Sequence, residues 1–113
     1  MISFEKGMYL RTIDGKIAKF IKYDEEDEEQ LITDYYQYST IWVGEIASYS
    51  FNIVDLIEVG DYVNGNEVLA ISEFKDGSRY IEFDEGRYLC KNYQIKSIVT
   101  KEQFESMKYS LEG

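Results

Sequence analysis

The sequence contains no histidine and no proline, and Cys90 is the single cysteine among its 113 residues. A lone cysteine excludes an intramolecular disulfide, and without histidine the common zinc ligand sets cannot be assembled. The usual general base near neutral pH is also missing, so neither a Ser-His-Asp nor a Cys-His arrangement can form. We therefore expect a protein that is not an enzyme, with no catalytic residues, no metal site and no cofactor.

Basic residues are scarce, with 12 Lys and Arg against 22 Asp and Glu and a net charge of −10. Such a charge repels the phosphates of nucleic acids and anionic lipids. Long apolar runs are also lacking, and the first residues have no basic segment followed by an apolar one, as a signal peptide would. We expect a cytoplasmic protein with no membrane association and no direct contact with nucleic acid.

Eleven Tyr, six Phe and one Trp, together with frequent Ile and Val, favour β-strands. Asp14-Gly15 and Asn64-Gly65 lie between apolar runs and predict two β-hairpins. Thr100 with Gln103 forms a capping-box pattern that predicts a short helix at 101–108. The other strands are expected at 30–38, 40–46, 68–74, 79–83, 87–90 and 95–99, with a connection at 47–52.

The two halves of the chain share a pattern. Gly7-Met8-Tyr9-Leu10 and Gly60-Asp61-Tyr62-Val63 each precede a turn glycine and a returning strand, as a duplicated unit would. We expect an N-terminal β unit at 1–50, with an acidic loop at 24–29, and a C-terminal β unit at 51–113 that ends in a helix. The predicted class is mainly β, either small SH3-like β-barrels or one antiparallel sheet built from two halves, with a short C-terminal α-helix.

Six consecutive acidic residues interrupt the first half, and because they repel one another they cannot be buried. A solvated loop without a specific role is the simplest interpretation. The run lacks the glycine and the ligand spacing of an EF-hand, so among functional interpretations attraction to a basic protein surface is favoured over calcium binding. The candidate partner-binding residues in this loop are Asp24, Glu25, Glu26, Asp27, Glu28 and Glu29.

Aromatic side chains gather just after this loop and could act as binding hot spots or as stacking platforms. Strand alternation would put Tyr36 and Tyr38 on one face and Tyr35 on the other. At least half of these rings are expected in the core, because a small β-domain uses its largest side chains there. The candidate partner-binding residues here are Tyr35, Tyr36, Tyr38 and Trp42, and Cys90 is predicted to be a buried core thiol.

Two segments resemble a group of small, largely uncharacterised phage and prophage proteins from Gram-positive bacteria. They are Asn52-Ile-Val-Asp-Leu-Ile-Glu-Val-Gly-Asp-Tyr-Val-Asn-Gly65 and Ile95-Lys-Ser-Ile-Val-Thr-Lys-Glu-Gln-Phe-Glu-Ser-Met107. The resemblance implies a β-rich phage accessory protein. Small acidic proteins of this kind are often counter-defence factors, so it also implies inhibition of a host immune protein.

Two functional hypotheses follow. In the first, the acidic loop and the aromatic segment bind a host defence protein with a basic surface in the host-cell cytoplasm. In the second, the protein is a sponge that sequesters a nucleotide immune signal, with a Tyr or Trp stacked on the base and Arg11, Arg79 or Arg87 paired with phosphate. The second needs a concave pocket, in one chain or between the subunits of an oligomer. The sequence leaves the oligomeric state and a structural role in the virion open.

Overall fold

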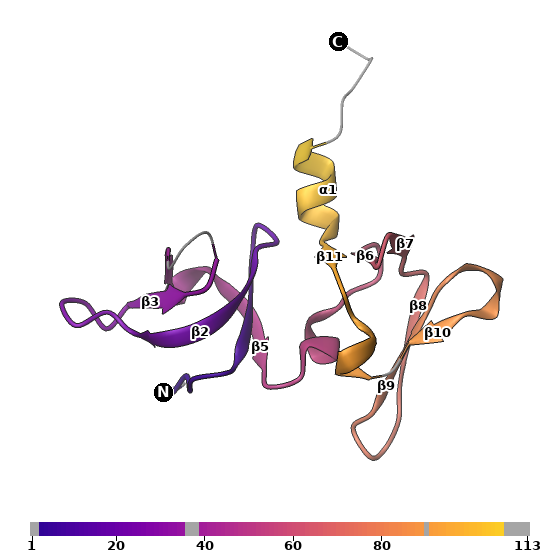
Figure 1. Ribbon diagram of the computed structural model, residues 1–113, viewed down its shortest axis with the longest axis horizontal. Coiled ribbons are helices and arrows are strands. Elements are labelled where there is room, and N and C mark those ends of the chain that lie inside the picture. The colour runs from indigo at the N-terminus through magenta and orange to yellow at the C-terminus, as the bar shows by residue number, and fades with distance from the viewer. Residues whose placement is uncertain (1–2, 36–38, 90, 108–113) are drawn as a thin grey trace, which may run out of the picture. The chain divides into compact units, whose positions relative to one another are not determined.

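The computed structural model describes residues 3–35, 39–89 and 91–107 (Figure 1). As predicted, the described chain is mainly β, with three antiparallel sheets and one short C-terminal α-helix. It divides into two compact units, unit 1 at Met1–Leu56 and unit 2 at Ile57–Gly113. No helix in the described ranges has the length and apolar character that crossing a bilayer requires.

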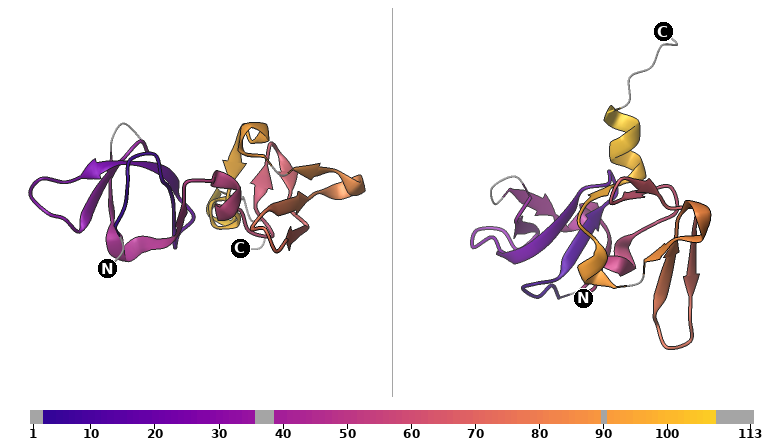
Figure 2. Two further views of the ribbon diagram at one scale, coloured as in Figure 1. Left: turned by 90° about the horizontal axis from the view of Figure 1, so that it is seen from below. Right: turned by 45° about the vertical axis from the view of Figure 1, so that its right-hand side comes forward.

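Unit 1 is built on one five-stranded sheet in the order β4-β3-β2-β1-β5. Strand β1 is central, because Leu10 lies opposite Ala18 of β2 on one side and opposite Tyr49 of β5 on the other. The strands curve around the core of the unit (Figure 2). The elements are β1 (Tyr9–Thr12), β2 (Ile17–Tyr23), β3 (Gln30–Thr33), β4 (Thr40–Trp42), the 3-10 helix η1 (Val43–Glu45), β5 (Ile46–Ser50) and the 3-10 helix η2 (Ile53–Leu56).

One cluster of buried side chains holds unit 1 together. Alternation along β3 turns Leu31 inward, and Leu10 of β1 and Phe20 of β2 meet it. Burying each of these side chains contributes about 1.5–3 kcal/mol. The cluster consists of Phe4, Met8, Leu10, Phe20 and Leu31, with Tyr23, Val43 and Ile46 packed against it.

The expected connection at 47–52 is wrong for its first part. The strand predicted at 40–46 ends at Trp42, a 3-10 turn follows, and the chain re-enters the sheet as β5. Three of the five residues of β5 are small, Ala47, Ser48 and Ser50, and all five are half-buried or exposed, so the sequence gives no apolar alternation that would indicate a strand. Pairing with β1 over Tyr9–Thr12 is what makes this segment a strand.

Unit 2 contains two three-stranded sheets, in the orders β11-β6-β7 and β10-β9-β8. Val63, Val68 and Ile81 are fully buried. The predicted Asn64-Gly65 hairpin is confirmed, with Tyr62 opposite Glu67. The elements are β6 (Tyr62–Val63), β7 (Asn66–Glu67), β8 (Ala70–Glu73), β9 (Arg79–Glu82), the 3-10 helix η3 (Asp84–Gly86), β10 (Tyr88–Leu89), the 3-10 helix η4 (Asn92–Gln94), β11 (Ile98–Val99) and α1 (Lys101–Met107).

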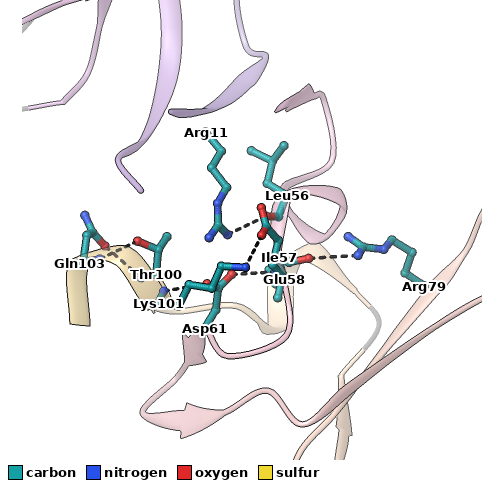
Figure 3. Close-up of polar contacts among 9 residues, drawn as sticks. All are labelled: Arg11, Leu56, Ile57, Glu58, Asp61, Arg79, Thr100, Lys101 and Gln103. Atoms are coloured by element: carbon teal, nitrogen blue, oxygen red, sulfur yellow. Dashed lines mark hydrogen bonds and ion pairs between the residues drawn. The ribbon is translucent and has the colours of Figure 1, made fainter. Parts of the chain in front are cut away.

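The predicted capping box at the start of α1 is confirmed. The amide of Thr100 donates to Gln103 Oε1 at 3.0 Å, and the amide of Gln103 donates to Thr100 Oγ1 at 3.3 Å. The buried carboxylate of Asp61 adds a second cap, because it accepts the amide of Lys101 at 2.9 Å (Figure 3). The same carboxylate accepts the amide of Glu58 at 2.7 Å, which ties the helix to the turn before β6.

The two units begin with the same turn. Gly7 and Gly60 both have φ +97°, a conformation that glycine adopts at little cost. In each turn the next residue donates its amide to the carbonyl three positions earlier, at 3.0 Å from Met8 to Glu5 and at 3.1 Å from Asp61 to Glu58. The returning segment donates an amide to the residue just before the first strand at the same distance of 2.8 Å, from Phe20 to Met8 and from Val68 to Asp61.

The order of the strands next to the first strand repeats as well, although β3 and β4 extend that sheet in unit 1 whereas β8, β9 and β10 form a separate sheet in unit 2. In unit 1 the first strand lies between β2 and β5, and in unit 2 the first strand lies between β7 and β11. In both units a 3-10 helix precedes the last strand, and a helical segment follows it. The structure therefore supports the duplication that the glycine pattern indicates.

The boundary between the units lies after Leu56, whereas the sequence places it after Ser50. Arg11 of β1 donates from Nη1 to the carbonyl of Leu56 at 2.9 Å, which attaches η2 to unit 1. Arg79 of β9 donates from Nη2 to the carbonyl of Ile57 at 3.0 Å, which attaches the next residue to unit 2 (Figure 3). Each unit thus holds its own side of the junction through an arginine.

Candidate binding groove

The acidic run joins β2 to β3, and its own hydrogen bonds give it a defined backbone. Asp24 Oδ1 accepts the amide of Glu26 at 2.8 Å, and Asp27 Oδ1 accepts the amide of Glu29 at 2.9 Å. Such turns are a common use of Asp in loops. The loop is closed at its base, where the amide of Asp24 donates to the carbonyl of Gln30 at 3.0 Å.

A groove of about 740 Å³ opens beside this loop. Among the described residues, four carboxylates and no basic side chain line it, so these side chains make its field negative. The remaining lining is mainly apolar or aromatic. The lining residues are Ser3, Phe4, Tyr23, Asp24, Glu25, Glu28, Glu29 and Val43, and we call this feature the acidic groove.

The apolar and aromatic lining residues Phe4, Tyr23 and Val43, which we call the floor of the acidic groove, belong to the core of unit 1 or pack against it. Phe4 is only 5% exposed, and its amide donates to the hydroxyl of Tyr23 at 2.8 Å. The Tyr23 ring packs edge-on against Phe20, with 5.1 Å between the ring centroids. The amide of Val43 donates to the carbonyl of Glu29 at 2.8 Å, so these two lining residues are bonded to each other.

The carboxylates of the acidic groove are dispersed. Among the described residues, no three Asp, Glu, Cys or His side chains come together in a way that could hold a metal ion. The volume lies within the range of about 300–1,000 Å³ that is typical of sites for organic ligands. The arrangement therefore suits an extended ligand with several positive charges better than a single cation.

The groove separates the six predicted acidic residues into two groups. Four of them line it, whereas Glu26 and Asp27 do not. Sequence reasoning missed the floor, because Phe4 and Val43 are far from the loop in sequence and have the character of ordinary core residues. Tyr23, the last residue of β2, carried no separate signal either.

Trp42 lies near the acidic loop but does not line the groove. It is opposite Gln30 in the β3–β4 pair, so it stands at the same end of the sheet as the loop. Alternation buries the neighbouring Ile41 and leaves the indole 50% exposed on the outer face. An exposed tryptophan beside a groove is the kind of side chain that dominates binding at interfaces.

The other predicted aromatic residues are not gathered at the loop by the described structure. Tyr35 follows the opposite end of β3, and its ring centroid lies 5.9 Å from the Lys16 ammonium. Tyr36, Tyr38 and Cys90 lie outside the described residues. Among the predicted aromatic residues that the structure describes, Trp42 is therefore the one near the acidic loop.

The arginines proposed for phosphate contact are engaged with backbone carbonyls. Arg11 and Arg79 hold the two carbonyls at the junction of the units, and Arg79 Nε also lies 3.3 Å from Glu73 Oε1. Arg87 donates from Nε to the carbonyl of Asp84 at 3.4 Å. None of the three lines the acidic groove.

A second exposed surface lies on the β8–β9–β10 sheet of unit 2. The cross-strand register puts Ser72 opposite Tyr80 and Glu82 opposite Tyr88 on one face. Both tyrosine rings are exposed, and Phe74 packs edge-on against Tyr80 with 4.9 Å between the centroids.

Two carboxyl groups with altered acidity lie in turns outside the groove. A hydrogen bond from the Thr12 hydroxyl lowers the pKa of Asp14, and the nearby Lys16 ammonium lowers it further. Hydrogen bonds from the Ser78 hydroxyl and amide lower the pKa of Asp76. Both shifts stabilise the ionised form of a turn carboxylate.

Comparison with protein-family models, with curated proteins and with solved structures gives no match to this chain.

Proposed function

We propose that the chain is a non-enzymatic phage accessory protein whose acidic groove binds a basic surface of a host immune protein and inhibits it in the host cytoplasm. The observation that carries the binding part is the groove itself, whose described lining combines four carboxylates with apolar and aromatic side chains and contains no Lys or Arg. The class of partner comes from the resemblance of two segments to small phage proteins.

Electrostatics gives the mechanism of association. The net charge of −10 steers a basic surface towards the protein, and the groove concentrates that field beside apolar surface that contact would remove from water. Because the groove carboxylates are mostly exposed, binding is expected to weaken as salt is added. Trp42 adds an aromatic anchor at the same end of the sheet.

In this proposal both units are small SH3-like β-barrels that serve as a rigid scaffold for the groove. The order β4-β3-β2-β1-β5, with a 3-10 helix before the last strand, supports this for unit 1. The first hairpin of unit 1 closes in a tight turn at Asp14-Gly15, and the acidic loop joins the second strand of the unit, β2, to the third, β3. The repeated turn and strand order support the same proposal for unit 2.

The groove favours the inhibitor over a sponge for a nucleotide signal. Phosphate would meet Asp24, Glu25, Glu28 and Glu29, and the part of the lining that the structure describes holds no Lys or Arg to compensate. Arg11 and Arg79 are already bonded to carbonyls of the main chain.

The test compares two variants that remove the same charge. The groove variant carries Glu25→Gln, Glu28→Gln and Glu29→Gln, and the control variant carries Glu26→Gln, Glu45→Gln and Glu67→Gln at exposed positions outside the groove. Asp24 is retained because its carboxylate shapes the loop.

Each tagged protein is captured from phage-challenged host cells and examined by native mass spectrometry. We expect a stoichiometric protein partner with the wild type and the control variant, and its loss with the groove variant. Equal retention by the two variants would contradict the role of the groove. An adduct of nucleotide mass would favour the sponge instead.

A further inference from the structure

We propose that the acidic groove receives an extended, arginine-rich peptide segment of its partner, with the side-chain stems on the apolar floor and the guanidinium groups at the carboxylates. This inference rests on the proposed function and specifies what enters the groove. It excludes two other occupants, a metal ion and a flat folded surface that stays outside the hollow.

The floor selects a side chain with an apolar stem. Phe4, Tyr23 and Val43 form it, and the Tyr23 oxygen already accepts the amide of Phe4. Long basic side chains bury their methylene groups along such surfaces while the charged end remains at the polar edge. Floor and carboxylates together therefore match both ends of Arg or Lys.

The distribution of charge requires several cations at separate points. Asp24 and Glu25 lie where the chain leaves β2, and Glu28 and Glu29 lie where it returns to β3. These side chains form no metal-binding cluster within the described chain. A segment with spaced basic residues satisfies both pairs, whereas one compact ion satisfies only one of them.

The shape of the groove favours an extended segment. A hollow of about 740 Å³ has room for several side chains, and a flat surface would leave it unfilled. The two Asp-based turns give the loop a defined conformation before binding, which lowers the entropy cost of ordering the loop when the peptide binds. Arginine is favoured over lysine because its planar guanidinium can engage a carboxylate through two parallel hydrogen bonds.

The test titrates the protein with synthetic octapeptides in a calorimeter, and follows the fluorescence of Trp42, the single tryptophan, as a second signal. The probes are a peptide of alternating Arg and Gly, the same peptide with citrulline in place of Arg, the Lys analogue, and spermine. We expect the Arg peptide to bind, the Lys analogue to bind more weakly, and the uncharged citrulline peptide to fail.

Matched double variants locate the binding. We expect Glu28→Gln/Glu29→Gln to weaken the Arg peptide by about tenfold, from two lost charge pairs near a surface. The control Glu26→Gln/Glu45→Gln removes the same charge away from the groove and should change affinity by less than about twofold. Circular dichroism of each variant checks that the fold is retained.

Three results would overturn the inference. They are no binding of the Arg peptide by the folded wild type, equal weakening in both double variants, and spermine binding as tightly as the peptide, which would indicate a small polyamine. If the peptide fails while partner capture still depends on Glu25, Glu28 and Glu29, the proposed function stands and the groove contacts a folded surface.

Discussion

The hydroxyl of Tyr23 accepts the backbone amide of Phe4 at 2.8 Å and so joins the start of the chain to the end of β2. Both side chains line the acidic groove, and both pack on the core of unit 1. This one hydrogen bond therefore holds together two residues that belong both to the floor of the groove and to the packing of the core.

Replacing Tyr23 by Phe tests this relationship. The ring and its contact with Phe20 are kept, but the amide of Phe4 loses its acceptor. We expect the free energy of unfolding to fall by about 1–3 kcal/mol, the cost of leaving a poorly solvated amide unpaired. Urea denaturation followed by circular dichroism measures the change, and a stability equal to that of the wild type would contradict the account.

Replacing Asp61 by Asn tests the double cap of α1. Asp61 is 0% exposed and accepts the amides of Glu58 and Lys101, so an amide side chain can preserve only one of the two bonds. We expect a loss of about 1–3 kcal/mol in the free energy of unfolding. Asp76→Asn is the control, because that exposed turn carboxylate accepts from Ser78 through one oxygen that Asn retains. Similar losses in both variants would argue against a special role for Asp61.

Replacing Asn64 by Ala tests the hairpin of unit 2. Asn64 has φ +53°, and its side chain bonds the carbonyl of Gln94 and the amides of Lys96 and Ser97. We expect a loss of about 2–3 kcal/mol from these bonds and from the unfavourable φ of alanine. Asn64→Gly removes the same bonds without the backbone strain and should cost less. If alanine proved as stable as asparagine, the side-chain bonds would contribute nothing.

Asp14 predicts a pH dependence of stability with a definite sign. The Thr12 hydroxyl and the Lys16 ammonium lower the pKa of Asp14 in the folded protein below its ordinary value of 3.8. Its contribution is therefore complete well above pH 4 and is lost as the pH falls through the lower folded pKa. Solvent screening limits it to less than about 1 kcal/mol.

The measurement compares the free energies of unfolding of the wild type and Asp14→Asn at pH 7 and at pH 3. We expect the advantage of the wild type to shrink at the lower pH. An advantage that grew at pH 3 would mean that the sign of the shift is wrong.

The sequence predicted the turns and the helix cap correctly, because these features depend on residues that are close together in the chain. Asp14-Gly15 and Asn64-Gly65 gave their hairpins, and Thr100 with Gln103 gave the cap of α1, because each of these depends on residues within a few positions. The strand β5 was missed, since only its pairing with β1 identifies it.

Only the acidic residues of the groove could be predicted from the sequence, and its floor could not. The charge of the run at 24–29 makes it easy to recognise in the sequence. Which of its residues line the groove depends on the loop conformation, including the turns formed by Asp24 and Asp27. The floor depends on tertiary packing that brings Phe4 and Val43 to Tyr23. Sequence alone cannot distinguish such residues from other core positions.

The central claim is that the acidic groove holds a basic partner, and the most direct test is the salt dependence of affinity for the captured partner. The groove variant Glu25→Gln/Glu28→Gln/Glu29→Gln is compared with the control Glu26→Gln/Glu45→Gln/Glu67→Gln between low and high salt. We predict a weaker affinity and a flatter salt dependence for the groove variant alone. Identical affinities and slopes for the two variants would contradict the claim.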